Sequence, residues 1–205
     1  MAVAEAAVGV EAAPTVAASA PVVAVTSVVV ALGGIGDMNL WLRIFKHRWL
    51  DESDVRRALD AKALQRLQER VAVSERQHSG EIRVCVEAGL PWSYLWRGAS
   101  ARERAVAMFG KLRVWDTEHN NGVLIYLLLA EHRIEIVADR GLNRHVTAAQ
   151  WHALTDGMAA AFKAGQYEAG LNAAVDSVSA MLTQHFAVVG HLANPNELPD
   201  APVIQ

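Results

Sequence analysis

A run of seven apolar residues in the second half of the chain constrains the fold more than any other feature. Residues 123–129 read Val-Leu-Ile-Tyr-Leu-Leu-Leu, without the alternation of polar and apolar side chains that a half-exposed strand shows. A strand of this composition is covered on both faces. Residues 122–130 are therefore predicted to form the central strand of a sheet with helices on both sides.

The segments around this run predict the topology of the sheet. Residues 81–87 and 133–138 alternate in polarity as half-buried strands do. An amphipathic helix is predicted between the first two strands, so they should be parallel, because strand, helix and strand normally form a right-handed crossover. Only Glu131 and His132 precede the third strand, which permits a hairpin. With the remaining helices, the sequence predicts a three-layer α/β/α sandwich with a small mixed sheet of three to four strands flanked by helices.

The chain of 205 residues is long enough for one such domain with tails. We expect a low-complexity, disordered tail over 1–37, an amphipathic helical segment over 38–59, the domain itself over 60–188, and a flexible tail over 189–205. The uncharged stretch 12–36 could in principle span a bilayer, but its prolines and glycines make a disordered tail simpler, and Met38 is an alternative start. Acidic residues precede this stretch, which argues against a secretory signal, so a cytoplasmic or membrane-associated location is expected.

Composition excludes several functions. A formal net charge of −3 gives no cationic surface for nucleic acid. The sequence contains no nucleophile elbow, phosphate-binding loop, dinucleotide fingerprint or metalloprotease helix, so no catalytic residue is assigned. The single cysteine, Cys85, lies in an alternating strand, where a thiol most often packs as a small apolar side chain.

Two groups of aromatic residues lie outside the predicted strands. Trp41, Phe45 and Trp49 recur every four residues and form one stripe of a helix. This stripe either docks on the domain, which is the simpler interpretation, or makes peripheral contact with an anionic membrane. The other group, in the predicted loop 89–100, either packs on the domain or contacts a partner; it comprises Trp92, Tyr94 and Trp96.

Polar loop residues are predicted to converge at one edge of the sheet. With the first two strands parallel and the third reversed, the start of strands one and two lies beside the end of strand three. Carboxylate and amide oxygens in these loops are the ligands that Ca²⁺ or Mg²⁺ prefers, and Arg140 could bind an anion beside them. Ordinary turn chemistry accounts for the same residues and is the simpler alternative. The candidate metal ligands are Glu81, Asp116, Asn120, Asn121 and Asp139.

Four ordered blocks between Ala61 and Phe186 resemble the TPM domain family. They are Ser-Gly-Glu-Ile at 79–82, Asn-Asn-Gly-Val-Leu-Ile at 120–125, Ile-Glu-Ile-Val-Ala-Asp-Arg-Gly-Leu at 134–142 and Ala-Phe-Lys-Ala-Gly-Gln-Tyr-Glu-Ala-Gly at 161–170. The resemblance implies an α/β/α sandwich, divalent-cation binding, and a relation to bacterial proteins often tethered to membranes and to a thylakoid acid phosphatase. Asn120 stands where the family usually has an acidic residue.

These observations lead to two functional hypotheses. The preferred one is an accessory or binding domain of a bacterial membrane-proximal or envelope system, which binds an unidentified protein partner and a divalent cation. The alternative is a metal-assisted phosphatase that hydrolyses phosphomonoesters, with a cation held by Glu81, Asp116 and Asp139 and the phosphate charge balanced by Arg140.

Overall fold

The computed structural model describes residues 29–30, 40–188 and 196–205. Apart from Val29–Val30, the predicted disordered tail 1–37 lies outside the described residues. The strands are β1 (Val29–Val30), β2 (Ile82–Glu87), β3 (Val123–Leu128), β4 (Arg133–Ala138) and β5 (Val203–Ile204). The helices are α1 (Leu40–Trp49), α2 (Glu52–Ala58), α3 (Ala61–Ser74), α4 (Trp92–Trp96), α5 (Ala101–Lys111), α6 (Arg140–Asn143), α7 (Ala148–Lys163) and α8 (Tyr167–Phe186), with a 3-10 turn η1 (Leu129–Glu131).

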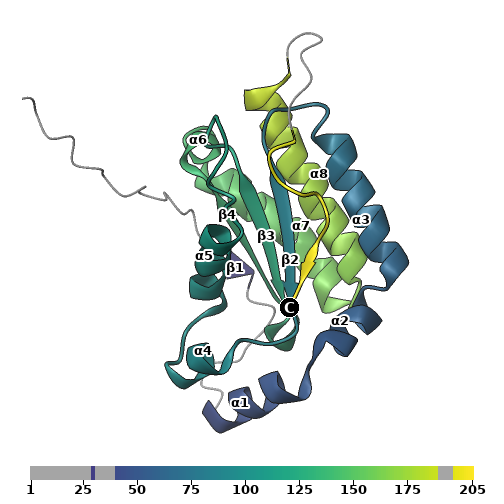
Figure 1. Ribbon diagram of the computed structural model, residues 1–205, viewed down its shortest axis with the longest axis vertical. Coiled ribbons are helices and arrows are strands. Elements are labelled where there is room, and N and C mark those ends of the chain that lie inside the picture. The colour runs from purple at the N-terminus through teal and green to yellow at the C-terminus, as the bar shows by residue number, and fades with distance from the viewer. Residues whose placement is uncertain (1–28, 31–39, 189–195) are drawn as a thin grey trace, which may run out of the picture.

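The apolar run forms β3, the central strand of the sheet. The strand order is β1-β4-β3-β2-β5 (Figure 1). β2 is parallel to β3 and β4 is antiparallel to it, so the predicted polarity is confirmed. Every residue of β3 is buried, because both faces of the sheet are covered.

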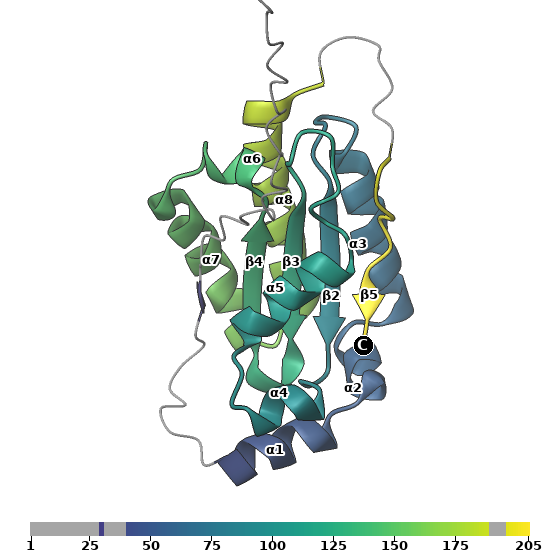
Figure 2. The ribbon, with the colours of Figure 1, turned by 60° about the vertical axis from the view of Figure 1, so that its left-hand side comes forward.

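Helices cover the two faces of the sheet unequally (Figures 1 and 2). Successive side chains of β3 point to opposite faces, so Ile125 joins one apolar cluster and Tyr126 the other. The first cluster contains Leu67 of α3 and Val175 of α8, and the second contains Phe109 of α5. The predicted three-layer α/β/α architecture is confirmed.

The structure differs from the sequence prediction at the sheet edges and in one loop. Two-residue strands, β1 and β5, extend the sheet at its two edges. Residues 196–205 belong to the segment expected to be a flexible tail, yet they lie along β2, which would otherwise present unpaired backbone groups. Within the predicted loop 89–100, residues Trp92–Trp96 form the short helix α4.

The predicted helical segment 38–59 contains two helices, α1 and α2. Asp51 caps the second: its Oδ1 accepts a hydrogen bond from Ser53 N at 2.7 Å, and Asp54 Oδ2 accepts one from Asp51 N at 3.0 Å. Such a capping box stabilises a helix start by about 1 kcal/mol. α1 and α4 lie at one end of the sheet, and the loops that precede β2 and β3 lie at the other (Figure 2).

Candidate functional site

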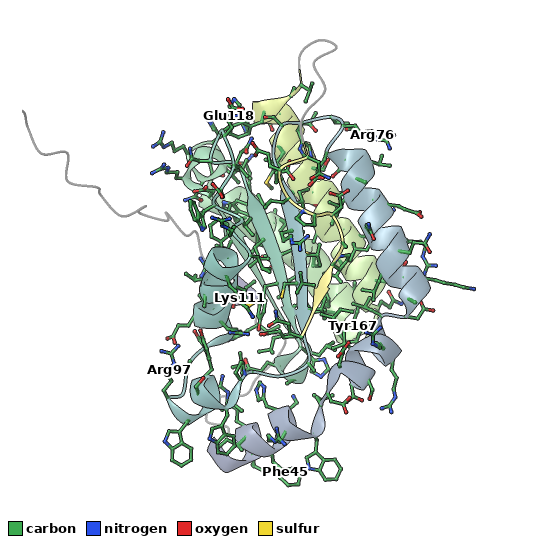
Figure 3. The ribbon with its side chains drawn as sticks, in the orientation of Figure 1. Phe45, Arg76, Arg97, Lys111, Glu118 and Tyr167 are labelled. Atoms are coloured by element: carbon green, nitrogen blue, oxygen red, sulfur yellow. The ribbon has the colours of Figure 1, made fainter. Side chains whose placement is uncertain are left out.

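Three loops meet at one end of the sheet, as the sequence predicted. Ile82, at the start of β2, is paired with Val123, at the start of β3, and Val123 is paired with Ala138, at the end of β4. The residues just outside these positions therefore share one rim, near the label of Glu118 in Figure 3. We call the loops 79–81, 116–122 and 139–141 the loop rim.

Glu81 is buried in the loop rim but turns toward the segment 196–205. Its two carboxylate oxygens accept hydrogen bonds from Glu197 N and Leu198 N, each at 3.3 Å. Burial, aided by the neighbouring carboxylates of Glu197 and Asp200, raises the pKa of Glu81 to about 7, although the hydrogen bonds from Glu197 N and Leu198 N lower it. Glu81 therefore holds this segment against the domain.

A second buried carboxyl group, Glu75, was not predicted from the sequence. It follows the last turn of α3 and is only 8% exposed. Its Oε1 accepts a hydrogen bond from Ile82 N at 2.8 Å. Burial raises the pKa of Glu75 to about 9, so the group is neutral at pH 7. No periodic signal marks such a position, because its burial depends on distant parts of the chain.

Asn120 and Arg140 tie two of the loops together. Arg140 donates from Nε and Nη2 to Asn120 Oδ1, at 3.1 and 2.9 Å. Asn120 has a positive φ of 52°, a conformation that Asn tolerates well. Gly141 N donates to Asn120 O at 2.7 Å, and a Cβ at position 141 would lie 2.4 Å from that same oxygen. The guanidinium of Arg140, which was predicted to bind an anion, thus links two loops of the rim through Asn120.

Asn121 and Asp139 are also buried in the rim. Asn121 is fully buried, and its Nδ2 donates to Ser79 Oγ at 3.2 Å. Asp139 is 4% exposed; its Oδ1 accepts from Arg140 N at 2.6 Å, and its own N donates to Gly122 O at 2.9 Å. Burial raises the pKa of Asp139. Asn121 Oδ1 and Asp139 Oδ2 have no hydrogen-bond partner among the described residues, and such buried oxygens are unusual.

The other predicted rim residues stand apart from this pair. The side chain of Asp116 is 52% exposed and lies 3.7 Å from Arg113 Nε, and Glu118 is exposed. Across residues 40–188 and 196–205, no three His, Cys, Asp or Glu side chains are grouped so that they could hold a metal ion. Among the five candidate ligands, Asn121 and Asp139 each have a buried side-chain oxygen without a hydrogen-bond partner among the described residues.

The opposite end of the molecule carries exposed aromatic side chains. α1 docks on the domain through Ile44 and His47, both buried. His47 Nδ1 accepts a hydrogen bond from Leu90 N at 2.9 Å, and its Nε2 lies 3.2 Å from Glu131. Arg43 Nε also donates to Glu131, at 2.9 Å. This polar network determines which face of α1 docks.

The predicted docking of the aromatic stripe is therefore wrong for Phe45 and Trp49, which are 60% and 73% exposed; the side chain of Trp41 lies outside the described residues. α4 packs beside α1 and adds Trp92 and Trp96, whose rings stack with centroids 5.9 Å apart. Both are more than half exposed. We call the exposed set the aromatic pole (Figure 3); it comprises Leu42, Phe45, Trp49, Trp92 and Trp96.

Two further sequence predictions concern reactivity and membrane insertion. Cys85 is fully buried, and burial raises the pKa of its thiol to about 12, which agrees with a packing role. Among the helices that the structure describes, none is both long and apolar enough to cross a bilayer.

The fold and the loop rim define a three-layer α/β/α domain with polar loops gathered at one end of a mixed sheet. The TPM domain model matches residues 53–181, which is more than half of the chain. The chain therefore belongs to the TPM domain family. A solved structure, the NMR structure of the BA42 protein from the psychrophilic bacterium Bizionia argentinensis, is similar, with 25% sequence identity and a TM-score of 0.63, over 72% of this chain and 95% of that one. No curated protein matches the chain.

Proposed function

We propose that this TPM domain is an accessory binding domain that works at a membrane surface and contacts anionic phospholipid through its aromatic pole. The observation that carries the proposal is the exposure of five large apolar side chains on two helices at one end of the molecule. Aromatic side chains are suited to the boundary between lipid tails and headgroups, where the ring is apolar and its surroundings are wet.

Charge at the aromatic pole supports an anionic surface as the partner. Lys46 and Arg48 lie on α1 beside Phe45 and Trp49. Arg97, which follows α4, has a side chain 58% exposed and lies 3.7 Å from Glu103 in a loose ion pair at the surface. The carboxylate of Glu131 is already engaged by Arg43, so it does not oppose a negative surface. Cations beside an apolar face are typical of helices that lie in the plane of a membrane.

Vesicle sedimentation tests this proposal. The chain should bind vesicles of phosphatidylcholine and phosphatidylglycerol, and bind pure phosphatidylcholine much less. Phe45→Ser with Trp49→Ser should weaken binding at least tenfold, because burying each such side chain contributes about 1.5–3 kcal/mol. Val73→Ser is the matched control, since Val73 is 52% exposed on α3, away from the aromatic pole. Equal binding by the double variant and the control would refute the proposal.

Divalent-cation binding at the loop rim is a second candidate, supported by the two unpaired oxygens of Asn121 and Asp139. Carboxylate and amide oxygens suit Ca²⁺ or Mg²⁺, and a cation bound at the carboxylate of Asp139 would give its Oδ2 the partner it lacks. Millimolar Ca²⁺ or Mg²⁺ should then raise the melting temperature of the wild-type chain and of Asp116→Asn, but not of Asp139→Asn. A shift that Asp139→Asn retains would contradict this assignment.

A metal-assisted phosphatase receives less support from the same contacts. The hydrolytic hypothesis needs Glu81 and Asp116 beside Asp139, and Arg140 facing the phosphate. Instead, Glu81 accepts N–H groups of the segment 196–205, and Arg140 donates to Asn120. Divalent-dependent turnover of a phosphomonoester by the purified chain, abolished by Asp139→Asn, would reverse this preference.

A further inference from the structure

The outer edge of β2 is covered by residues 196–205, which we call the edge strap. Val203 and Ile204 pair in parallel with Cys85 and Val86. Gln205 N donates to Val86 O at 3.0 Å, and Ala88 N donates to Gln205 O at 2.9 Å. The strap runs along β2 in Figure 2, where it is drawn in yellow. An added strand of this kind is how sheet edges bind extended peptides.

Few side chains hold the edge strap in place. Leu198 is its one buried residue, 9% exposed and packed in the apolar cluster that contains Cys85. The Gln205 side chain accepts from Arg104 Nη2 and Lys111 Nζ at 3.3 and 3.4 Å, near the limit for a hydrogen bond. Backbone pairing, the hydrogen bonds to Glu81, the buried Leu198 and the partly buried Val203 and Ile204 therefore supply most of the contact. Another extended segment with apolar residues at these places can reproduce these features.

The edge strap leaves a buried cation unsatisfied. Arg83 projects from β2, is 8% exposed, and its Nε and Nη1 have no hydrogen-bond partner among the described residues. Burial lowers the pKa of its guanidinium, and Asp200 of the strap and Glu75 are the nearby acidic groups that oppose this effect. The Oδ1 of Asp200 is occupied by Asn196 Nδ2, at 2.7 Å. A buried guanidinium without hydrogen bonds is costly, so a carboxylate that reached it would bind with a net gain.

We propose that the outer edge of β2 is a strand-addition site for an extended peptide of a partner protein, and that the edge strap occupies this site in cis. The peptide that fits carries an apolar residue in the place of Leu198 and a carboxylate long enough to bond the Arg83 guanidinium. The site lies between the loop rim and the aromatic pole. It does not involve the aromatic pole, so it is independent of the membrane proposal, but it shares Glu81 with the loop rim, because Glu81 accepts hydrogen bonds from Glu197 N and Leu198 N.

Fluorescence anisotropy with a labelled synthetic peptide of residues 196–205 tests the strand-addition site. Leu198→Ser in the full chain removes the anchor of the strap, and Ala201→Ser changes an exposed strap residue as the matched control. The peptide should bind the Leu198→Ser chain at least tenfold more tightly than the wild-type or Ala201→Ser chain, because the tethered competitor is weakened. A peptide that itself carries Leu198→Ser should not bind.

A second peptide tests the role of Arg83. Asp200→Glu in the peptide lengthens its carboxylate, so affinity for the Leu198→Ser chain should rise several-fold, and this gain should vanish when the chain also carries Arg83→Gln. Circular dichroism establishes that each variant is folded, and Gln205→Pro, which removes the N–H bonded to Val86 O, is a second way to loosen the strap. Absence of peptide binding to folded Leu198→Ser and Gln205→Pro chains would overturn the proposal. Dimers of the wild-type chain that exchange their straps would also overturn it, because the site at the edge of β2 would then bind a second copy of this chain and not a partner protein.

Discussion

Glu81→Gln should change the pH dependence of stability by an amount that the structure defines. The carboxyl group has an ordinary pKa of 4.5, and burial raises it to about 7 in the folded chain. Each unit of this difference corresponds to 1.36 kcal/mol, so the shift amounts to about 3 kcal/mol in favour of the neutral form. Because the folded-state pKa is the higher one, this contribution is fully present below pH 4.5 and is lost as the pH rises toward 7.

Glutamine has nearly the same shape as glutamate but does not ionise. The stability of the Glu81→Gln chain should therefore lack the decrease with rising pH that Glu81 causes. Urea unfolding of both chains at pH 5, 6, 7 and 8 gives the free energy of unfolding at each pH. The difference, wild type minus Glu81→Gln, should fall by about 3 kcal/mol between pH 4.5 and 8, most of it between pH 5 and 7. Glu75 and Glu135, whose pKa values are also raised, are present in both chains and contribute to both profiles. Glu118→Gln, at an exposed rim position, is the control. A difference that stays constant with pH would refute the assignment of a buried, proton-retaining Glu81.

The remaining predictions concern the rim and the core. Gly141→Ala should destabilise the chain by about 1–3 kcal/mol in urea unfolding, because its Cβ would lie 2.4 Å from Asn120 O and 2.5 Å from His119 O. Gly110→Ala on α5 is the control: its Cβ would meet nothing within 4 Å, so this variant should be neutral or slightly stabilising. Equal stability of the two variants would contradict the close packing of the loops. Cys85 should resist an aromatic disulfide reagent in the native chain and react fully in denaturant, since burial raises its pKa to about 12; rapid native labelling would show that the strap side of the sheet opens readily.

The sheet could be predicted from the sequence because its signals are local. Seven consecutive apolar residues indicate a strand covered on both faces, and the short link before the third strand predicts a hairpin, which β3 and β4 form. The strand itself ends at Leu128, earlier than predicted, because η1 (Leu129–Glu131) belongs to the link. Strand polarity then brought Glu81, Asn120 and Asp139 to one rim without any knowledge of side-chain contacts. Turn chemistry, the simpler alternative for these loops, is also present, since Asn120 has the positive φ that Asn tolerates.

Contacts between distant segments could not be predicted in this way. The docking face of α1 depends on Glu131, far along the chain, which draws His47 and Arg43 inward and leaves Phe45 exposed. An amphipathic pattern indicates that one face is apolar, but it does not indicate whether another polar residue elsewhere competes for the packing surface. The surroundings of the buried Glu75 and Arg83 likewise include a distant residue, Asp200, which belongs to a segment whose composition is that of a loose tail.

The three candidate sites are arranged so that they can act at the same time. The loop rim and the aromatic pole lie at opposite ends of strands of six residues, which span about 20 Å, while the edge strap runs between them. Perturbations more than about 10 Å apart with no shared partners are usually additive. Substitutions at Phe45 and Trp49 should therefore leave any effect at Asp139 unchanged. The edge strap is different, because Glu81 belongs to the rim and also holds Leu198 N. A ligand that displaces the strap must break the hydrogen bonds to Glu81. Binding at the edge of β2 would therefore change the surroundings of Glu81 and so couple this site to the loop rim.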